Sequence, residues 1–170
     1  MSTKVTPQEK KAPALHANTG LSDKDAQAVA LLLNTLLADE YVLYTKVRNY
    51  HWNVEAPNFM ELHKFYESMY EELAETIDEF AERVRKIGHY AEARLKDFLE
   101  LTHLEEPDYS NDSRVQIKNL LDDHETLCRY IRTHIDETQD KYRDAGTNDF
   151  LVAVLKQHEK WAWFLRSYLG

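Results

Sequence analysis

The sequence has little cysteine, glycine and proline. Cys128 is the only cysteine among 170 residues, so no disulfide can form within the chain, which is typical of a reducing compartment. Four glycines and four prolines provide few turns and favour a helical protein. No stretch approaches the roughly 20 apolar residues of a membrane span, and residues 1–20 lack the apolar run of a secretory signal. The sequence therefore predicts one soluble, cytoplasmic protein, long enough to bury a core without disulfides.

Charge is unevenly distributed along the chain. The formal net charge is -9 at pH 7, from 21 basic and 30 acidic residues. Residues 1–20 are polar and basic, with Lys4, Lys10 and Lys11 against a single acid, whereas the remainder is strongly acidic. An acidic body attracts cations and repels nucleic acid. The sequence thus predicts a flexible basic N-terminal arm, residues 1–20, and an acidic domain, residues 21–170.

Apolar residues recur at helical spacing along four long segments. The clearest stripe runs through Leu62, Phe65, Met69, Leu73, Ile77, Phe80 and Val84. Ser22 with Asp25 resembles an N-terminal capping box, and Gly88 stands where a helix C-cap is expected. We therefore expect helices over residues 22–53, 59–87, 113–145 and 148–168, with Gly146 ending the third.

The connection between the second and third helices is long. It covers residues 89–112, too many for a tight turn, and residues 94–101 could form a short helix within it. Four long helices with one long crossover predict an all-α, ferritin-like four-helix bundle, with a short helix in the crossover between helices 2 and 3.

The second helix carries two pairs of metal-ligating residue types. His63 with Glu67, and Asp78 with Glu82, are each four residues apart and therefore meet on one helix face. The 11 residues from Glu67 to Asp78 leave about 20° of net rotation, so both pairs point roughly the same way, yet they lie ~16 Å apart along the axis. One metal ion cannot be bound by both pairs of a single helix.

The spacing suggests how the pairs could meet. Residues 63 and 82, and likewise 67 and 78, are centred on the same point between residues 72 and 73. If two copies of the helix packed antiparallel about a twofold axis there, His63 would face Glu82 of the partner and Glu67 would face Asp78 of the partner. Two identical sites would form, each built half by one chain and half by the other. His51, near the end of the first helix, could add a second imidazole.

Carboxylates and imidazoles without a thiolate suit iron, manganese or zinc. Mixed nitrogen and oxygen ligation with few ligands per metal leaves positions open for an oxidant. The competing interpretation is chance, because a helix this rich in acids shows charged pairs at this spacing without any metal.

Residues 48–85 resemble the signature of the Dps family, the DNA-binding proteins from starved cells. The matching elements are His-Trp-Asn at 51–53, Asn-Phe at 58–59, Leu-His at 62–63, Glu67, and Asp-x-x-Ala-Glu-Arg at 78–83. The flanking segments also have matching lengths, so the resemblance covers nearly the whole chain. It implies a four-helix subunit of a hollow dodecamer, with ferroxidase sites shared across a dimer interface.

The resemblance also implies the ligands and the reaction. The ligands of the iron, a di-iron site shared between two subunits, would be His51, His63, Glu67, Asp78 and Glu82. The reaction would oxidise Fe(II), preferably with hydrogen peroxide, and deposit Fe(III) mineral in the cavity. Two irons reacting with one peroxide consume the oxidant without releasing hydroxyl radical, so iron storage and DNA protection would go together.

Other residues carry weaker signals. In the family, a tryptophan at the position of Trp52 lies against the site and could intercept stray oxidising equivalents, although ordinary packing explains it as well. Asp122 and Asp123 stand near the start of the third helix, where family members line a threefold pore with acids, but Asp is also common in the first turns of a helix.

Cys128 shares a helix face with apolar residues and is expected in the core. The remaining histidines, His16, His89, His124, His134 and His158, are expected to be surface or hydrogen-bonded residues, and the lone Glu-x-x-His at 100–103 is read as chance.

Two alternatives to the iron cage stay open. Lys4, Lys10 and Lys11 could bind DNA weakly, and twelve arms on one cage would add avidity. The chain could therefore be a DNA-compacting nucleoid protein whose metal sites are mainly structural. It could also be a small metal-binding dimer that never forms a cage.

Overall fold

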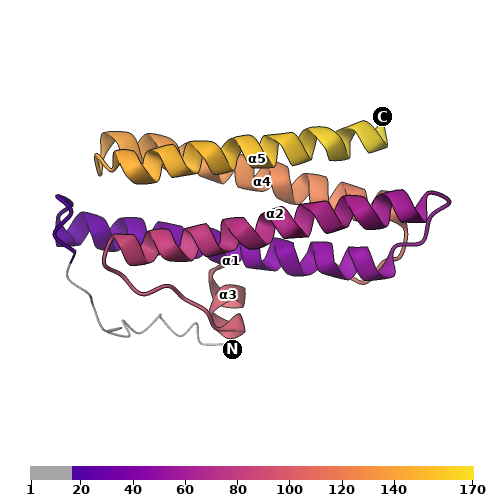
Figure 1. Cartoon of the computed structure of the whole chain (residues 1–170), viewed down its shortest axis with the longest axis horizontal. Coiled ribbons are helices and arrows are strands. Elements are labelled where there is room, and N and C mark those ends of the chain that lie inside the picture. The colour runs from indigo at the N-terminus through magenta and orange to yellow at the C-terminus, as the bar shows by residue number, and fades with distance from the viewer. Residues whose placement is uncertain (1–16) are drawn as a thin grey trace, which may run out of the picture.

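The computed structural model describes residues 17–170 (Figure 1). It contains five helices: α1 (Asp23–Asn53), α2 (Phe59–Lys86), α3 (Leu95–Leu101), α4 (Ser113–Asp140) and α5 (Ala145–Leu169). Within this range the only β pairing is an isolated bridge between Glu55 and Asp112. The prediction of an all-α bundle with a short helix in the crossover is therefore confirmed.

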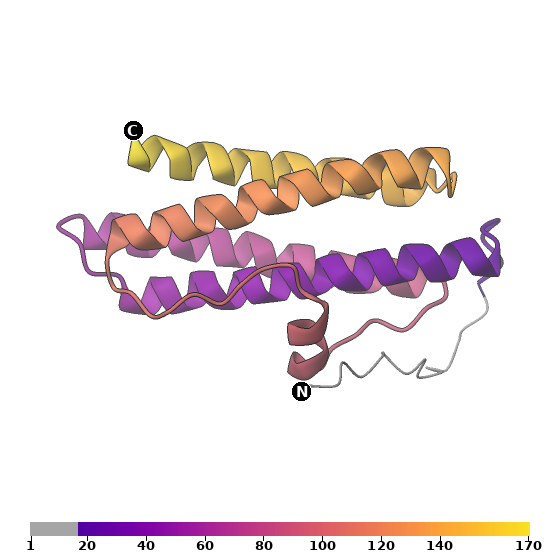
Figure 2. The same ribbon diagram turned by 180° about the vertical axis from the view of Figure 1, so that it is seen from behind.

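The four long helices form two antiparallel hairpins that lie side by side. Helices α1 and α2 form one hairpin, and α4 and α5 form the other (Figure 1). The crossover leaves α2, places α3 against α1, and then follows α1 to the start of α4 (Figure 2). The long crossover is thus needed to return the chain to the end of the bundle where α2 began.

Side-chain caps fix the helix starts that the sequence predicted. The Ser22 hydroxyl accepts a hydrogen bond from the Asp25 amide (3.1 Å), and the Asp112 carboxylate accepts from the amides of Arg114 and Val115. Such caps satisfy amides that have no carbonyl partner within the helix. At the end of α2, Gly88 has a φ of 89°, as predicted for a C-terminal cap.

The predicted boundaries between the last two helices are wrong. Helix α4 ends at Asp140 rather than at 145, α5 begins at Ala145 rather than at 148, and Gly146 lies in the first turn of α5 instead of ending α4. The reason is a contact with α2: Arg83 donates to Asp144 (2.8 Å) and to the Thr147 hydroxyl (3.0 Å), while Asp144 caps the Thr147 amide (3.0 Å). A Cβ atom on residue 146 would lie 2.8 Å from the Arg83 guanidinium, so glycine leaves room for this ion pair.

The core lies between the four long helices. Its fully buried side chains come from every one of them and include Leu33, Leu36, Leu43, Leu62, Met69, Leu73, Phe80, Leu120, Leu127, Ile131, Leu151 and Leu165. By length and composition alone, α1 is long and apolar enough to cross a membrane. In the bundle, however, 72% of that apolar stretch is buried against the other helices, as in the core helix of a bundle.

Candidate metal centre

His51 and His63 form a reciprocal pair at one end of the bundle. His51 lies in the last turn of α1 and His63 in the second turn of α2, and the five-residue connection between the helices brings them together. The His51 Nδ1 lies 2.8 Å from the His63 carbonyl oxygen, and the His63 Nδ1 lies 2.8 Å from the His51 carbonyl oxygen. The two rings stack with centroids 3.7 Å apart.

These two hydrogen bonds determine which ring nitrogen is available. A carbonyl oxygen can only accept, so each imidazole must carry its hydrogen on Nδ1. In the neutral form the lone pair of each ring is then on Nε2, which is the state in which histidine binds a metal. A hydrogen bond from the second ring nitrogen to a carbonyl is the usual way in which proteins orient a metal-binding histidine.

Aromatic neighbours fix the plane of both rings. Phe59 stacks on His63 with centroids 5.1 Å apart, and Tyr70 meets His51 edge-on at 5.2 Å. His51 is buried, whereas His63 is half-buried, so His63 is the more accessible of the two rings. The two imidazoles are thus held in place before any ligand arrives.

Glu67 lies one helical turn beyond His63 on the same face of α2. Its side chain is 38% exposed, and the nearest cation, Lys64, is 3.9 Å away. Burial, and then the negative charge of Glu67, raise the pKa of the neighbouring Tyr70 phenol. Glu67 therefore provides a lightly paired carboxylate beside the two histidines.

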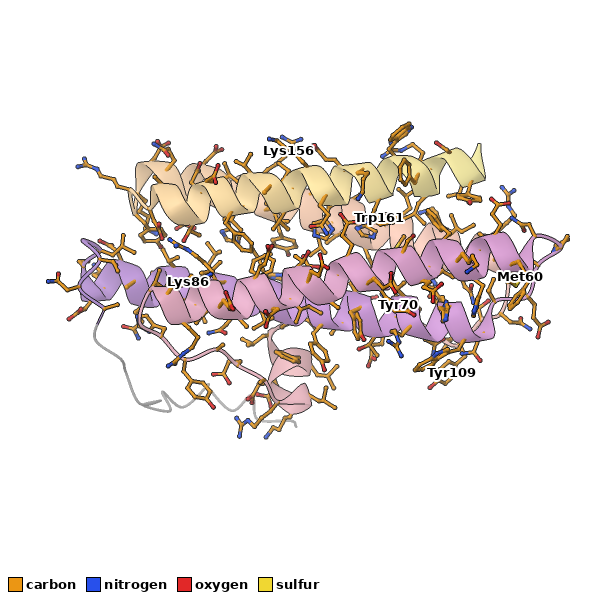
Figure 3. All side chains as sticks on the ribbon, in the orientation of Figure 1. Met60, Tyr70, Lys86, Tyr109, Lys156 and Trp161 are labelled. Carbon is orange, nitrogen blue, oxygen red and sulfur yellow. The ribbon has the colours of Figure 1, made fainter. Side chains whose placement is uncertain are left out.

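Asp78 and Glu82 lie farther along α2, and both are exposed. Figure 3 marks the span: Met60, before His63, and Lys86, which pairs with Glu82 at 2.8 Å, lie at opposite ends of α2. The hydrogen bond from Lys86 lowers the pKa of Glu82. Across residues 17–170, no three His, Cys, Asp or Glu side chains are placed so that they could hold a metal ion.

Comparison with known proteins identifies the family. A ferritin-like domain model matches residues 30–170. DNA protection during starvation protein 2 of Bacillus anthracis is 35% identical, over 82% of this chain and 94% of that protein. The Dps protein of Vibrio cholerae superposes with a TM-score of 0.86 at 30% identity, covering 94% of this chain and 100% of that chain. This chain belongs to the Dps family of ferritin-like proteins. A low temperature-induced protein of Nostoc, of uncharacterised function, is 44% identical over 89% of this Dps chain and 86% of its own length.

Trp52 directly follows His51 in this Dps chain and is 64% exposed. The Arg48 guanidinium lies 5.2 Å from the Trp52 ring, 4.5 Å from the Tyr70 ring and 5.7 Å from the Tyr44 ring. Three aromatic rings therefore surround one arginine within a helical turn of His51, and Trp52 is one of them.

Asp122 and Asp123 lie in the third turn of α4 and have different surroundings. Asp122 is exposed and pairs with Lys118 at 2.5 Å. Asp123 is only 13% exposed and pairs with the buried Lys46 at 2.5 Å. Burial raises the pKa of Asp123, and the charge of Lys46 opposes that shift. Of the two pore candidates, Asp122 alone has a carboxylate that faces solvent.

The three candidate DNA-binding residues, Lys4, Lys10 and Lys11, lie outside the described residues.

Two of the histidines that were expected at the surface or in hydrogen bonds are hydrogen-bonded, and both ring nitrogens of His158 have partners. His124 and His158 are both buried in the core and contact each other, and the Nε2 of His124 has no hydrogen-bond partner in the described part of the chain. The sequence contained a signal for this: His124 stands four residues after Leu120 and three before Leu127, on the buried stripe of α4. Cys128 is half-buried, and burial raises the pKa of its thiol to about 11.

Proposed function

We propose that this Dps chain is a subunit of a ferroxidase and iron-storage cage. Its sites would be di-iron centres shared between two subunits, with His51, His63 and Glu67 from one chain and Asp78 and Glu82 from the other. The cage would be a dodecamer built from dimers, in the cytoplasm, storing Fe(III) mineral and protecting DNA from oxidation. The observation that carries the proposal is the reciprocal His51–His63 pair, because it prepares two Nε2 lone pairs for a metal ion.

The donor set supports iron. Two imidazoles with three carboxylates suit divalent first-row metals, and the absence of a thiolate among them disfavours copper(I) and iron–sulfur clusters. The half-buried His63 and the partly exposed Glu67 leave one side of the half-site open to a second chain. The names of the relatives agree: the Vibrio cholerae protein is described as a ferritin-like diiron-carboxylate protein, and the Bacillus anthracis protein as one that protects DNA during starvation.

The histidines and the carboxylates of the proposed site would have different roles. The two Nε2 atoms would bind the metal, and the carboxylates would neutralise its positive charge and accept more charge as Fe(II) becomes Fe(III). Lys86 would hold Glu82 until the metal competes for its oxygens. The iron, as substrate, supplies the electrons: two Fe(II) ions give one electron each to hydrogen peroxide, which takes up two protons and leaves as two waters.

A complementation experiment tests the shared site. One variant carries His63→Ala with Glu67→Ala, and the other carries Asp78→Ala with Glu82→Ala. Each variant alone should lose iron oxidation with peroxide, since every site lacks one half. When the two are coexpressed, each mixed dimer contains one fully intact and one fully disabled site, so about a quarter of the parent activity should return.

The outcomes are distinct. Recovery after coexpression is expected only if the ligands come from two chains. If either variant alone keeps the parent rate, or if purified mixed oligomers stay inactive, the shared site is refuted. Light scattering tests the cage separately, because the mass of a dimer would eliminate the dodecamer while leaving the shared site intact.

A further inference from the structure

A chain of three buried polar side chains crosses the interior of the bundle. Glu40 on α1, His158 on α5 and His124 on α4 have exposed fractions of 0%, 1% and 0%. The Glu40 Oε1 lies 2.7 Å from the His158 Nε2, and the His158 Nδ1 lies 2.8 Å from the His124 Nδ1. Because α1 belongs to one hairpin and α4 and α5 to the other, these contacts join the two hairpins. None of the three residues belongs to the proposed iron site.

The contact between the two histidines limits how many protons they can hold. Two nitrogens 2.8 Å apart are hydrogen-bonded only if one hydrogen lies between them. A protonated imidazole carries a hydrogen on both ring nitrogens. If His124 and His158 were both protonated, two N–H groups would point at each other. The folded bundle can therefore hold at most one of these two histidines in the charged form.

Among residues 17–170, no other core group is available to neutralise a second positive charge. Within the same range the Oε2 of Glu40 and the Nε2 of His124 have no hydrogen-bond partner. The other buried charged groups are already paired: Asp39 with His103, Lys46 with Asp123, Asp97 with Arg94, and Asp144 with Arg83.

Helix α2 adds no charge to this interior. In the middle of the helix its buried side chains are Tyr66, Met69, Leu73 and Thr76. Burial raises the pKa of the Tyr66 phenol, which therefore stays neutral, and Thr76 donates to Gln157 (3.0 Å). Since no three His, Cys, Asp or Glu side chains among residues 17–170 are placed so that they could hold a metal ion, the ligand that Glu40, His158 and His124 can take up is a proton rather than a metal ion.

We propose that Glu40, His158 and His124 form an acid-sensitive latch, which joins the two hairpins near neutral pH and opens when both histidines become protonated. Opening breaks the Nδ1–Nδ1 hydrogen bond between His124 on α4 and His158 on α5. The link that runs from α4 through His158 to Glu40 on α1 is then lost. The stability of the bundle, and of any assembly built from it, then depends on pH through these three residues.

The sign of the effect follows from proton counting. Burial, and then the charge of His158, hold the pKa of His124 well below its ordinary value. In the unfolded chain both histidines protonate near pH ~6.5. Well below that pH the unfolded state binds at least one more proton than the folded state, so stability that is present above pH ~6.5 is lost as the pH falls. The folding equilibrium constant should fall by about tenfold per pH unit for each proton of this difference.

The test compares the full-length parent with His124→Asn, in which an amide replaces Nδ1 as donor to His158 but cannot titrate. Urea unfolding is followed by circular dichroism between pH 7.5 and pH 5, at one protein concentration. As the pH is lowered, the folding equilibrium constant of the parent should fall by up to about tenfold more per pH unit than that of His124→Asn. The matched control, His89→Asn in the crossover, removes a histidine outside the core and should keep the slope of the parent.

A second measurement uses the unaltered protein, in case His124→Asn does not fold. NMR of the parent with 13C-labelled histidine should show one buried imidazole that stays neutral at every pH at which the bundle is folded. The latch is refuted if His124→Asn keeps the pH dependence of the parent, or if both buried imidazoles become protonated while the protein remains folded.

Discussion

His51 and His63 each bind the backbone of the other: the Nδ1 of either ring lies 2.8 Å from the carbonyl oxygen of the opposite residue. Two imidazoles that belong to different helices are therefore oriented as one unit. This arrangement makes each histidine a positioning residue for its neighbour as well as a candidate ligand, because the backbone carbonyl of each accepts the hydrogen bond that orients the other ring, and the two rings stack.

The first prediction concerns this coupling. His51→Ala should remove one candidate ligand and the ring that stacks on His63, while the carbonyl of residue 51 still accepts from the His63 Nδ1, so the initial rate of Fe(II) oxidation should fall by at least about tenfold. The unfolding free energy should fall by about 2 kcal/mol, since a buried hydrogen bond and a stacked ring are lost. Stopped-flow absorbance and urea unfolding measure the two effects. If His51→Ala combined with Asp78→Ala leaves iron oxidation unchanged, the assignment of the site is wrong.

The second prediction concerns Lys46 and Asp123. Lys46→Met leaves a buried carboxylate without its cation and should cost about 3–5 kcal/mol of unfolding free energy at pH 7. Burial already raises the pKa of Asp123, and the loss of Lys46 should raise it further. A group whose folded pKa is raised contributes stability at low pH that is lost as the pH rises through that pKa. The difference between variant and parent should therefore shrink from pH 7 to pH 5.

The control for this pair replaces both partners. Lys46→Met with Asp123→Leu leaves no unpaired charge and should restore most of the parent stability at pH 7, as seen when buried ion pairs are replaced by apolar groups. An equal loss for Lys46→Met at pH 5 and pH 7 would show that packing, and not the charge of Asp123, carries the effect.

The third prediction concerns Trp52 as an acceptor of stray oxidising equivalents. Trp52→Phe should leave the rate of Fe(II) oxidation nearly unchanged but increase the hydroxyl radical trapped in solution, since the proposed acceptor beside the half-site is gone. Spin trapping measures the radical, and peptide mass spectrometry should find oxidised Trp52 in the parent. Trp163 on α5, 60% exposed, is the matched control. Equal radical yields from the Trp52 variant and the parent would assign Trp52 to packing.

The fourth prediction concerns DNA. If Lys4, Lys10 and Lys11 bind phosphates, full-length protein should shift DNA in a gel at low salt, and added salt should abolish the shift. Protein lacking residues 1–20 should not shift DNA at any salt concentration, because the remaining chain is strongly acidic. If the full-length protein fails to shift DNA at every salt concentration, direct DNA binding is excluded and protection would have to come from iron chemistry alone.

Much of the fold could be predicted from local patterns. The stripe through Leu62, Met69, Leu73 and Phe80 marks the buried face of α2, and Ser22 caps α1 as expected. The end of α4 could not be predicted, since it depends on Arg83, which lies 61 residues before Asp144 in the chain. Glycine at 146 looked like a helix end, whereas it makes room for that arginine.

The sequence by itself determined the five helices and the two candidate ligand pairs on α2, because residues three or four apart on a helix share a face whatever the rest of the protein does. Only the tertiary structure decided which ring nitrogens of His51 and His63 are free, that Asp123 is neutralised by Lys46, and that Glu40, His158 and His124 form one buried chain. Each of these depends on side chains from different helices, up to 118 residues apart. Such contacts are made only when the helices pack, so they cannot be predicted from the helical periodicity of the sequence.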